Sequence, residues 1–264
     1  MTRRERLDLA LVHRGLAETR ERAQSLILSG SVLVDGVAAT RPAQGVSGDA
    51  AVELIGRGPA YVSRGAFKLR TALDRWGIDP RNKIALDVGA STGGFTDLLL
   101  ERGARRVYAV DVGYGQLHYR LRGDPRVVVM ERTNIRHLTE LPEQSDVGVV
   151  DVSFISLRLA LPPVFRLVKD DIVALIKPQF EAGRARVSKG GVVRDPAVHG
   201  RVLTDLVEWS QSQAWRIVDL TASPIRGPAG NVEFLSRWLQ GVEAVPLDRI
   251  RQVVAASGSA AGTP

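Results

Sequence analysis

The sequence contains no cysteine. Disulfide bonds, thiolate metal sites and cysteine nucleophiles are therefore excluded. It also lacks any apolar run close to the roughly 20 residues that span a bilayer. The N-terminus is charged and has no apolar segment typical of a secretory signal. We expect a cytoplasmic protein with no membrane partner, and no residue pattern predicts a metal site or an obligate protein partner.

Lysine is scarce as well. Of the 36 basic residues only five are lysines. Where arginine serves as the general cation, a lysine indicates a property that arginine lacks, above all the ability to lose its proton when buried. The five lysines are Lys68, Lys83, Lys169, Lys177 and Lys189.

What the sequence does have is a basic excess and an ample apolar fraction. The 264 residues carry a net charge of +7, and 44% of them are hydrophobic. The charge favours a polyanionic partner only weakly. The densest basic cluster contains Arg184, Arg186, Lys189 and Arg194. A solvated protein face explains that cluster as well as nucleic-acid binding does.

The first 56 residues predict a small α+β domain. Leu7, Ala10 and Leu11 share one helical face, and a second helix is expected from about Thr19 to Ser29. Val32 to Val37, with Asp-Gly in the middle, is typical of a tight hairpin. An interdomain linker is expected at residues 57–64.

Residues 65–252 follow a different pattern, in which apolar strands alternate with amphipathic helices. Such strands are typical of a parallel sheet covered by helices on both faces. Residues 253–264 are rich in Ala, Ser and Gly, and we expect a disordered tail there. Strands are expected at 84–88, 107–111, 127–130, 147–151, 172–177, 217–220 and 233–239.

A glycine-rich turn follows the first of these strands. The turn departs from G-x-G-x-x-G and lacks the Lys-Ser/Thr of a phosphate-binding loop, which favours a nucleoside cofactor without phosphates. Asp87 precedes the turn, where it suits the ammonium of a methionine group, and Asp111 ends the next strand, where it suits ribose hydroxyls. These features favour S-adenosylmethionine over an ordinary strand-to-helix turn with two capping acids. The turn itself contains Gly89, Ala90, Ser91, Thr92, Gly93 and Gly94.

Thr133 and Asn134 follow the third strand and are further candidates for cofactor contacts. Asn134 is placed to meet the adenine edge. An equally good interpretation is that it caps a helix N-terminus.

Four residues far apart in the sequence form the catalytic hypothesis. Asp151 and Lys177 end the fourth and fifth strands, Glu233 begins the last strand, and Lys68 lies on a helix before the first. Strand ends at one edge of a sheet converge on one crevice. Two lysines and two acids suit methyl transfer to a ribose hydroxyl, because that poor nucleophile must lose its proton as the methyl arrives. Taken singly, each residue also has a purely structural explanation.

Two absences narrow the methyl acceptor. Base N-methylation in this fold commonly uses an Asn/Asp-Pro-Pro-aromatic run, where this chain has Asp-Val-Ser-Phe at 151–154. Methylation of pyrimidine C5 needs a cysteine. Oxygen is the acceptor that remains.

The chain resembles the TlyA-type ribosomal RNA 2'-O-methyltransferases, an older name for which is haemolysin. The stretch from Leu9 to Gly36 resembles the S4 RNA-binding module. The matching pieces of the catalytic domain are 62–68, 87–96, 111–117, 131–134, 151–156, 177–181, 190–196 and 227–233.

The resemblance implies an α/β fold, a Rossmann-like S-adenosylmethionine-dependent methyltransferase sheet preceded by a small α+β S4-like domain. It implies a catalytic tetrad of Lys68, Asp151, Lys177 and Glu233 and 2'-O-methylation of cytidine in 23S rRNA. The extra basic residues at the N-terminus favour 16S rRNA as a second substrate. Residues expected to contact ribosomal RNA are Arg3, Arg4, Arg14, Arg20, Arg22, Arg184, Arg186 and Lys189.

The sequence disfavours two other functions. One is a non-catalytic RNA-binding protein of ribosome assembly with an inactive Rossmann domain, which the intact tetrad disfavours. The other is a membrane-lytic protein, which the lack of a strongly amphipathic cationic helix disfavours.

Overall fold

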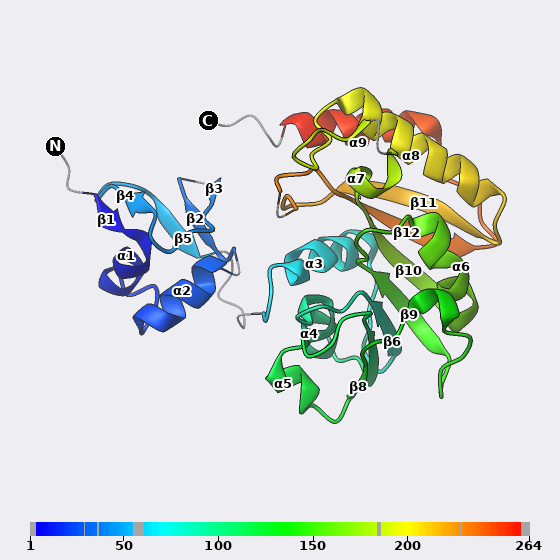
Figure 1. Ribbon diagram of the computed structural model, residues 1–264, viewed down its shortest axis with the longest axis horizontal. Coiled ribbons are helices and arrows are strands. Elements are labelled where there is room, and N and C mark those ends of the chain that lie inside the picture. The colour runs from blue at the N-terminus through cyan, green and yellow to red at the C-terminus, as the bar shows by residue number, and fades with distance from the viewer. Residues whose placement is uncertain are drawn as a thin grey trace. The chain divides into compact units, whose positions relative to one another are not determined.

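The chain separates into two units at the boundary between Arg64 and Gly65. Unit 1 comprises residues 1–64 and unit 2 residues 65–264, drawn in blue to cyan and in cyan to red in Figure 1. The computed structural model describes residues 4–28, 30–35, 37–54, 61–183, 186–227 and 229–259. Of the linker expected at 57–64, residues 57–60 lie outside the described residues, and residues 61–64 end unit 1.

Unit 1 is built as the sequence predicted, from two helices followed by a hairpin. Leu7, Leu11 and Ile27 are fully buried in its core. Asp35 takes the positive φ of 51° that a tight hairpin turn requires. Short partner strands that the sequence did not reveal complete the sheets. The elements are β1 Glu5–Arg6, α1 Leu7–His13, α2 Arg20–Leu28, β2 Val32–Val34, β3 Val37–Ala38, β4 Gly45–Val46 and β5 Val52–Leu54.

A seven-stranded sheet forms the centre of unit 2. Its strands are β6 Ile84–Val88, β7 Arg106–Val110, β8 Val127–Met130, β9 Ser145–Val150, β10 Val168–Ile176, β11 Trp215–Ala222 and β12 Phe234–Gln240. The strand order is β11-β12-β10-β9-β6-β7-β8. β6 to β10 pair in parallel, whereas β12 runs antiparallel to both β10 and β11. The expectation of a parallel sheet is therefore wrong for β12. A run of apolar residues does not encode its own direction.

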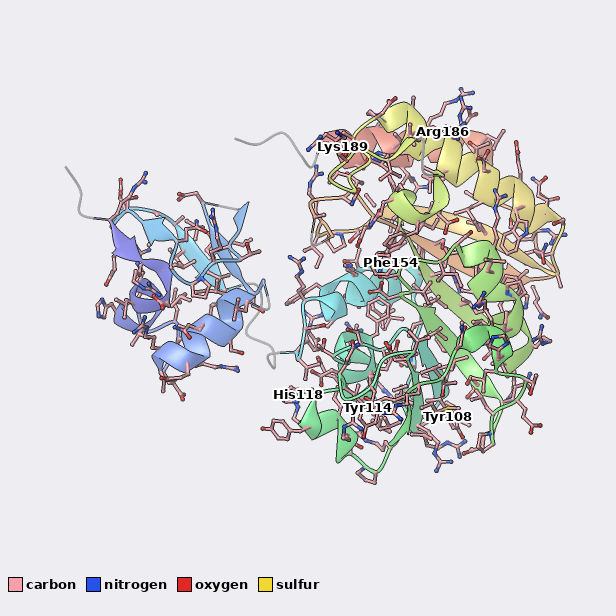
Figure 2. The ribbon with its side chains drawn as sticks, viewed as in Figure 1. Tyr108, Tyr114, His118, Phe154, Arg186 and Lys189 are labelled. Carbon is pink, nitrogen blue, oxygen red and sulfur yellow. The ribbon has the colours of Figure 1, made fainter. Side chains whose placement is uncertain are left out.

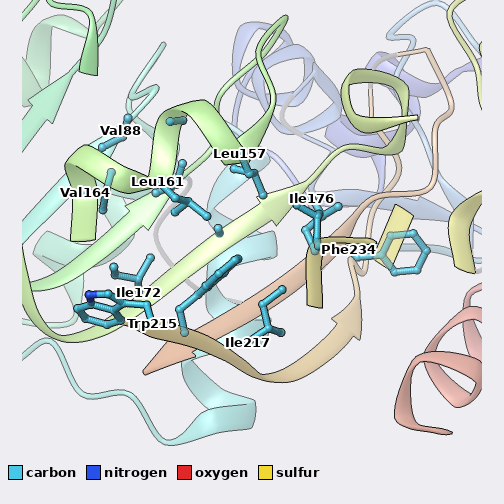
Figure 3. Close-up of a cluster of buried hydrophobic side chains, with 14 of the residues drawn as sticks. Val88, Leu157, Leu161, Val164, Ile172, Ile176, Trp215, Ile217 and Phe234 are labelled. Carbon is cyan, nitrogen blue, oxygen red and sulfur yellow. The ribbon is translucent and has the colours of Figure 1, made fainter. Parts of the chain in front are cut away.

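Helices cover both faces of this sheet (Figure 1). On one face α3 packs against α4 and β12. On the other face α6 and α8 bury the cluster of aliphatic and aromatic side chains drawn in Figure 3, which includes Val88, Leu161 and Trp215. The helices are α3 Gly65–Trp76, α4 Gly94–Glu101, α5 Tyr119–Arg122, η1 Ile135–His137, α6 Leu157–Leu167, α7 Pro178–Glu181, α8 Pro196–Gln211 and α9 Leu247–Ser259.

The predicted disordered tail at residues 253–264 is wrong in its first half. Residues 253–259 complete α9, and residues 260–264 lie outside the described part. The helix buries Ile250, Val253 and Ser257 at a spacing of three and four residues and packs on α8 and β11. Tertiary packing, with the good helix propensity of alanine, outweighs the composition that suggested disorder.

None of the helices in the described ranges has the length and hydropathy needed to cross a membrane.

Candidate active site

The carboxyl edge of the unit 2 sheet gathers the predicted catalytic residues. Asp151 follows β9, and Lys177 follows the adjacent strand β10. The last antiparallel pair of β10 and β12 is Ile176 with Phe234, so the next residues, Lys177 and Glu233, lie side by side. The reversed direction of β12 is what brings Glu233, at the start of its strand, to this edge.

Lys68 joins this edge from α3. Its Nζ lies 2.6 Å from Oε2 of Glu233, and both side chains are buried, with 8% and 1% of their surface exposed. A buried ion pair of this kind is strongly destabilised when one partner is removed, because an uncompensated charge then remains in the interior.

Lys177 forms the second ion pair. Its Nζ lies 2.6 Å from Oδ1 of Asp151 and 2.9 Å from Oγ of Ser153. The four predicted residues thus occur as two lysine–carboxylate pairs, Lys177 with Asp151 and Lys68 of α3 with Glu233. The structure places Lys177 at the junction, paired with Asp151 and next to Glu233 in strand register.

A cavity of about 650 Å³ opens beside Asp151. A volume of this size suits a small-molecule ligand. Six of the predicted residues line it: Gly89, Ser91, Asp111, Thr133, Asn134 and Asp151. The lining within the described residues does not include the remaining predicted cofactor contacts, Asp87, Ala90, Thr92, Gly93 and Gly94.

The missing side chains of Gly89 and Gly93 leave space for other atoms of the protein. A Cβ on Gly89 would lie 2.4 Å from the backbone oxygen of Asp151, and one on Gly93 would lie 2.2 Å from Cδ1 of Leu121. Both glycines also have positive φ, 84° and 99°. Gly89 therefore allows the segments that follow β6 and β9 to meet closely at the cavity wall, which places the glycine-rich turn directly against Asp151.

Asp87 is fully buried below the turn. Thr96 Oγ1 donates a hydrogen bond of 2.6 Å to its Oδ2, whereas Oδ1 has no hydrogen-bond partner among the described residues. Burial raises the pKa of Asp87 to about 7, and the nearby carboxylates of Asp151 and Asp111 add to this rise. A buried carboxylate oxygen without a partner is suited to receive a donor from a ligand.

Asp111 is held rigidly at the end of β7. Its Oδ2 accepts from the backbone N–H of Ser91 at 2.8 Å and its Oδ1 from that of Gly113 at 2.6 Å. Each oxygen retains lone pairs for further donors. These backbone contacts fix the carboxylate in the cavity wall.

Asn134 caps a helix N-terminus, which is one of the two roles that the sequence allows for it. Its side chain accepts from the backbone N–H of Arg136 and caps η1, while the residue also lines the cavity. Thr133 donates its hydroxyl hydrogen to the carbonyl of Glu131. Both side chains are thus engaged within the protein.

Models of two known families match the chain. The FtsJ-like methyltransferase family matches residues 61–238, and the S4 domain matches residues 5–52. The 16S/23S rRNA (cytidine-2'-O)-methyltransferase TlyA of Mycobacterium tuberculosis is 48% identical over 247 residues, which cover 91% of each chain. The chain belongs to the TlyA family. It is therefore a methyltransferase that carries an S4 RNA-binding domain.

Other relatives agree with this assignment. Hemolysin A of Brachyspira hyodysenteriae is 42% identical over 239 residues, which cover 89% of this chain and 99% of the relative. A solved structure from Streptococcus thermophilus, described as a hemolysin, has a TM-score of 0.75 and 37% identity and covers 98% of both chains. The fold and the order of the two domains are thus shared along the TlyA-family chain.

The sequence did not predict one residue of the site, Phe154. Phe154 lines the cavity, exposes 91% of its surface and has a φ of 64° (Figure 2). A bulky residue in the left-handed region is strained, and such strain concentrates at functional sites. The aromatic residue at 154 was visible in the sequence, but no sequence signal predicts its backbone conformation.

The S4 arginines fall into two groups. Asp8 is fully buried and accepts from Arg6, Arg20 and Gln24, and its hydrogen bond from Arg6 holds its pKa well below the usual range. Arg20 therefore helps to hold α1 and α2 together, as well as being a candidate RNA contact. Arg14 likewise donates to the carbonyls of residues 47, 48 and 50.

The other predicted RNA contacts are less constrained. Arg4 and Arg22 are exposed in unit 1, and within its described part the guanidinium of Arg22 has no ion pair. Arg186 and Lys189 are exposed in unit 2 and lie in the upper part of Figure 2. Arg3 and Arg184 lie outside the described residues.

Gly89→Ala is expected to destabilise unit 2 by about 1–3 kcal/mol, because the added Cβ collides with the backbone of Asp151. Chemical denaturation followed by tryptophan fluorescence measures this, since all four tryptophans lie in unit 2. Gly200→Ala is the control. Its Cβ meets nothing within 4 Å inside α8, so we expect a gain of up to about 1 kcal/mol. Equal stability of the two variants would contradict the close approach.

Proposed function

We propose that this TlyA-family protein transfers a methyl group from S-adenosylmethionine to the 2'-hydroxyl of cytidine in 23S rRNA, and also in 16S rRNA. The observation that carries the proposal is the placement of two lysine–carboxylate pairs at the sheet edge beside a cavity of ligand size. The name of the Mycobacterium tuberculosis relative supports the substrate. Action on ribosomal RNA implies a cytoplasmic location.

Two carboxylates suit the two ends of S-adenosylmethionine, one in the cavity wall and one buried below the glycine-rich turn. Asp111 is positioned to accept from the ribose hydroxyls of the nucleoside, and the unpartnered Oδ1 of Asp87 suits the ammonium of the methionine group. Val112, 69% exposed in the cavity wall, offers an apolar surface to the adenine. When bound, the sulfonium would supply an electrophilic methyl group, and its sulfur would keep the electron pair of the broken carbon–sulfur bond and leave as the thioether S-adenosylhomocysteine.

Lys177 acts on the methyl acceptor. In its neutral form its Nζ accepts the proton of the 2'-hydroxyl, so that the ribose oxygen gains the electron pair with which it bonds to the methyl carbon. Ser153 accepts a hydrogen bond from the Lys177 nitrogen and Asp151 lies beside it as an ion-pair partner, which fixes the position of Nζ for its contact with the acceptor. Asp151 then stabilises the ammonium that forms.

Lys68 and Glu233 support this step from the adjacent strand. The Lys68 ammonium, held by Glu233, adds a fixed positive charge at the sheet edge where Lys177 lies. Glu233 keeps that cation in place, and it lies where it can orient the ribose. Because both side chains are buried, water does not screen their charges strongly.

Phe154 offers a surface for the base of the target nucleotide. A ribose edge in a duplex is hard to approach, so we expect the cytidine to be extruded from its stack. Stacking of a base on an exposed aromatic ring contributes about 1–3 kcal/mol. The exposed ring of Phe154 lies three residues from Asp151, at the mouth of the same cavity.

Lys177→Ala is expected to abolish methyl transfer to ribosomal subunits while leaving S-adenosylmethionine affinity nearly unchanged, because Lys177 does not line the cavity among the described residues. Transfer of labelled methyl and calorimetry measure the two quantities. Lys169→Ala, which removes a lysine paired with Asp146 at the start of β9, is the control and should remain active. Activity in Lys177→Ala would refute its assigned role.

S-adenosylmethionine affinity should fall with decreasing pH below 7. Burial raises the pKa of Asp87 to about 7, so acid neutralises the group that receives the ligand ammonium. Each pH unit below 7 should cost up to about tenfold in affinity, while a ligand α-amino group of pKa about 7.7–8.0 remains protonated. Calorimetry from acidic to neutral pH tests this.

Methylthioadenosine lacks the ammonium and provides the matched control ligand. Its affinity should not follow the titration of Asp87. The Asp87→Asn variant should bind S-adenosylmethionine weakly and without the pH dependence. A pH-independent affinity in the wild-type protein would rule out the contact between Asp87 and the ammonium.

Arg22→Ala should weaken ribosomal RNA binding and reduce the slope of log affinity against log salt by about one, as expected when one phosphate contact is lost. S-adenosylmethionine affinity should not change. Arg251→Ala removes an exposed arginine from α9 and serves as the control. Arg22 is preferred to Arg20 here because Arg20 also contacts the buried Asp8. An unchanged slope would exclude the Arg22 face of the S4 unit as the docking surface.

A further inference from the structure

Two segments at the active site are fastened to each other along their length. One is the loop of residues 151–156 between β9 and α6, and the other runs from residue 177 to residue 181. Lys177 contacts Asp151 and Ser153, and the rings of Phe180 and Phe154 lie 5.0 Å apart. The contacts follow the same order along both segments, and the last of them involves a residue to which the proposed mechanism assigns no role.

That residue is Glu181, at the end of α7. Its Oε2 accepts from the hydroxyl of Ser156 at 2.6 Å, and its Oε1 accepts from the backbone N–H of Leu157 at 2.8 Å. Ser156 is the N-cap of α6 and itself accepts from the backbone N–H of Arg158. Glu181 therefore places a carboxylate at the positive end of the α6 dipole, where an anion is stabilised.

Glu181 is held in this position at an electrostatic cost. Burial raises its pKa above the ordinary value, and the two hydrogen bonds oppose that rise. Arg158 is a nearby cation, yet its guanidinium donates a hydrogen bond to the carbonyl of Asp205. A partly buried carboxylate with both oxygens committed to one loop fixes that loop more firmly than an apolar contact would.

The loop that Glu181 holds needs such support. Phe154 has its strained φ of 64° within it, and strain of this kind persists only when surrounding contacts determine the conformation. Lys177 holds the beginning of the loop, and Glu181 holds its end. Residues 151–156 also form one wall of the cavity.

We propose that Glu181 is a positioning residue for methyl transfer, which fixes the 151–156 loop so that Asp151 and Phe154 face Lys177 and the acceptor nucleotide. The inference rests on the proposed function. If Glu181 were a simple helix cap, its loss would affect stability alone. As a positioning residue, Glu181 also affects turnover in the folded enzyme.

The test compares Glu181→Ala with Asp146→Ala in the full-length protein. Asp146 is the matched control, since it also accepts a backbone N–H, from Ile84 at 2.8 Å, but at the start of β9, opposite the active site. Glu181→Ala should lower kcat on ribosomal subunits on the order of 10- to 100-fold, as expected for a small misplacement of reacting groups. Asp146→Ala should lower Tm and leave kcat unchanged.

Glu181→Gln adds a conservative comparison. Its amide oxygen can still accept one of the two hydrogen bonds, so its kcat should lie between those of wild type and Glu181→Ala. If Glu181→Ala does not fold, a reduced kcat in a folded Glu181→Gln carries the proposal. Hydrogen exchange should be faster over residues 151–161 in the Glu181 variants and unchanged there in Asp146→Ala.

The outcomes separate the inference from the function on which it rests. A wild-type protein that transfers no methyl group to ribosomal subunits overturns the proposed function. An active wild type with a folded Glu181→Ala of equal kcat overturns the inference alone. The inference also falls if Asp146→Ala loses as much kcat at the same loss of Tm, or if Glu181→Gln is the sole folded variant and keeps the wild-type kcat.

Discussion

The proposed active site depends on the antiparallel pairing of β12 with β10. In a sheet of parallel strands, residues that begin a strand lie at the opposite edge from residues that end one. Because β12 is reversed, Glu233 precedes its first residue at the same edge where Asp151 and Lys177 follow the last residues of β9 and β10. Glu233 then holds Lys68 of α3 at the same edge. One reversed strand therefore connects the helix before the sheet with the chemistry at its end.

Much of this arrangement could be predicted from the sequence. The spacing of apolar residues predicted both ends of six unit 2 strands to within two residues of the observed ends. For β10 it predicted only the end that leads into Lys177 this closely. The glycines and the acidic residue before them indicated the turn after β6. These signals are local, because the pattern of apolar residues in a strand or helix can be read from that segment alone. The three polar residues beside strand ends, Asp151, Lys177 and Glu233, followed from the same pattern.

What the sequence did not reveal depends on contacts between distant segments. The direction of β12, the burial of one face of α9 and the sharing of Arg20 between Asp8 and solvent are set by packing partners far along the chain. The glycines at 89 and 93 were expected to admit a ligand, yet the atoms they accommodate belong to Asp151 and Leu121. Residue type indicated that something approaches closely there, and only the fold identifies what it is.

The Lys68–Glu233 pair joins positions 165 residues apart. Closing a loop of that length has an entropic cost that must be met before the contact contributes anything in return. During synthesis α3 and the first parallel strands leave the ribosome long before β12 does. A nascent chain that ends before residue 233 has Lys68 without its counter-ion, however well the early strands have paired. The Lys68–Glu233 pair at the proposed active site is therefore completed late, when β12 is added.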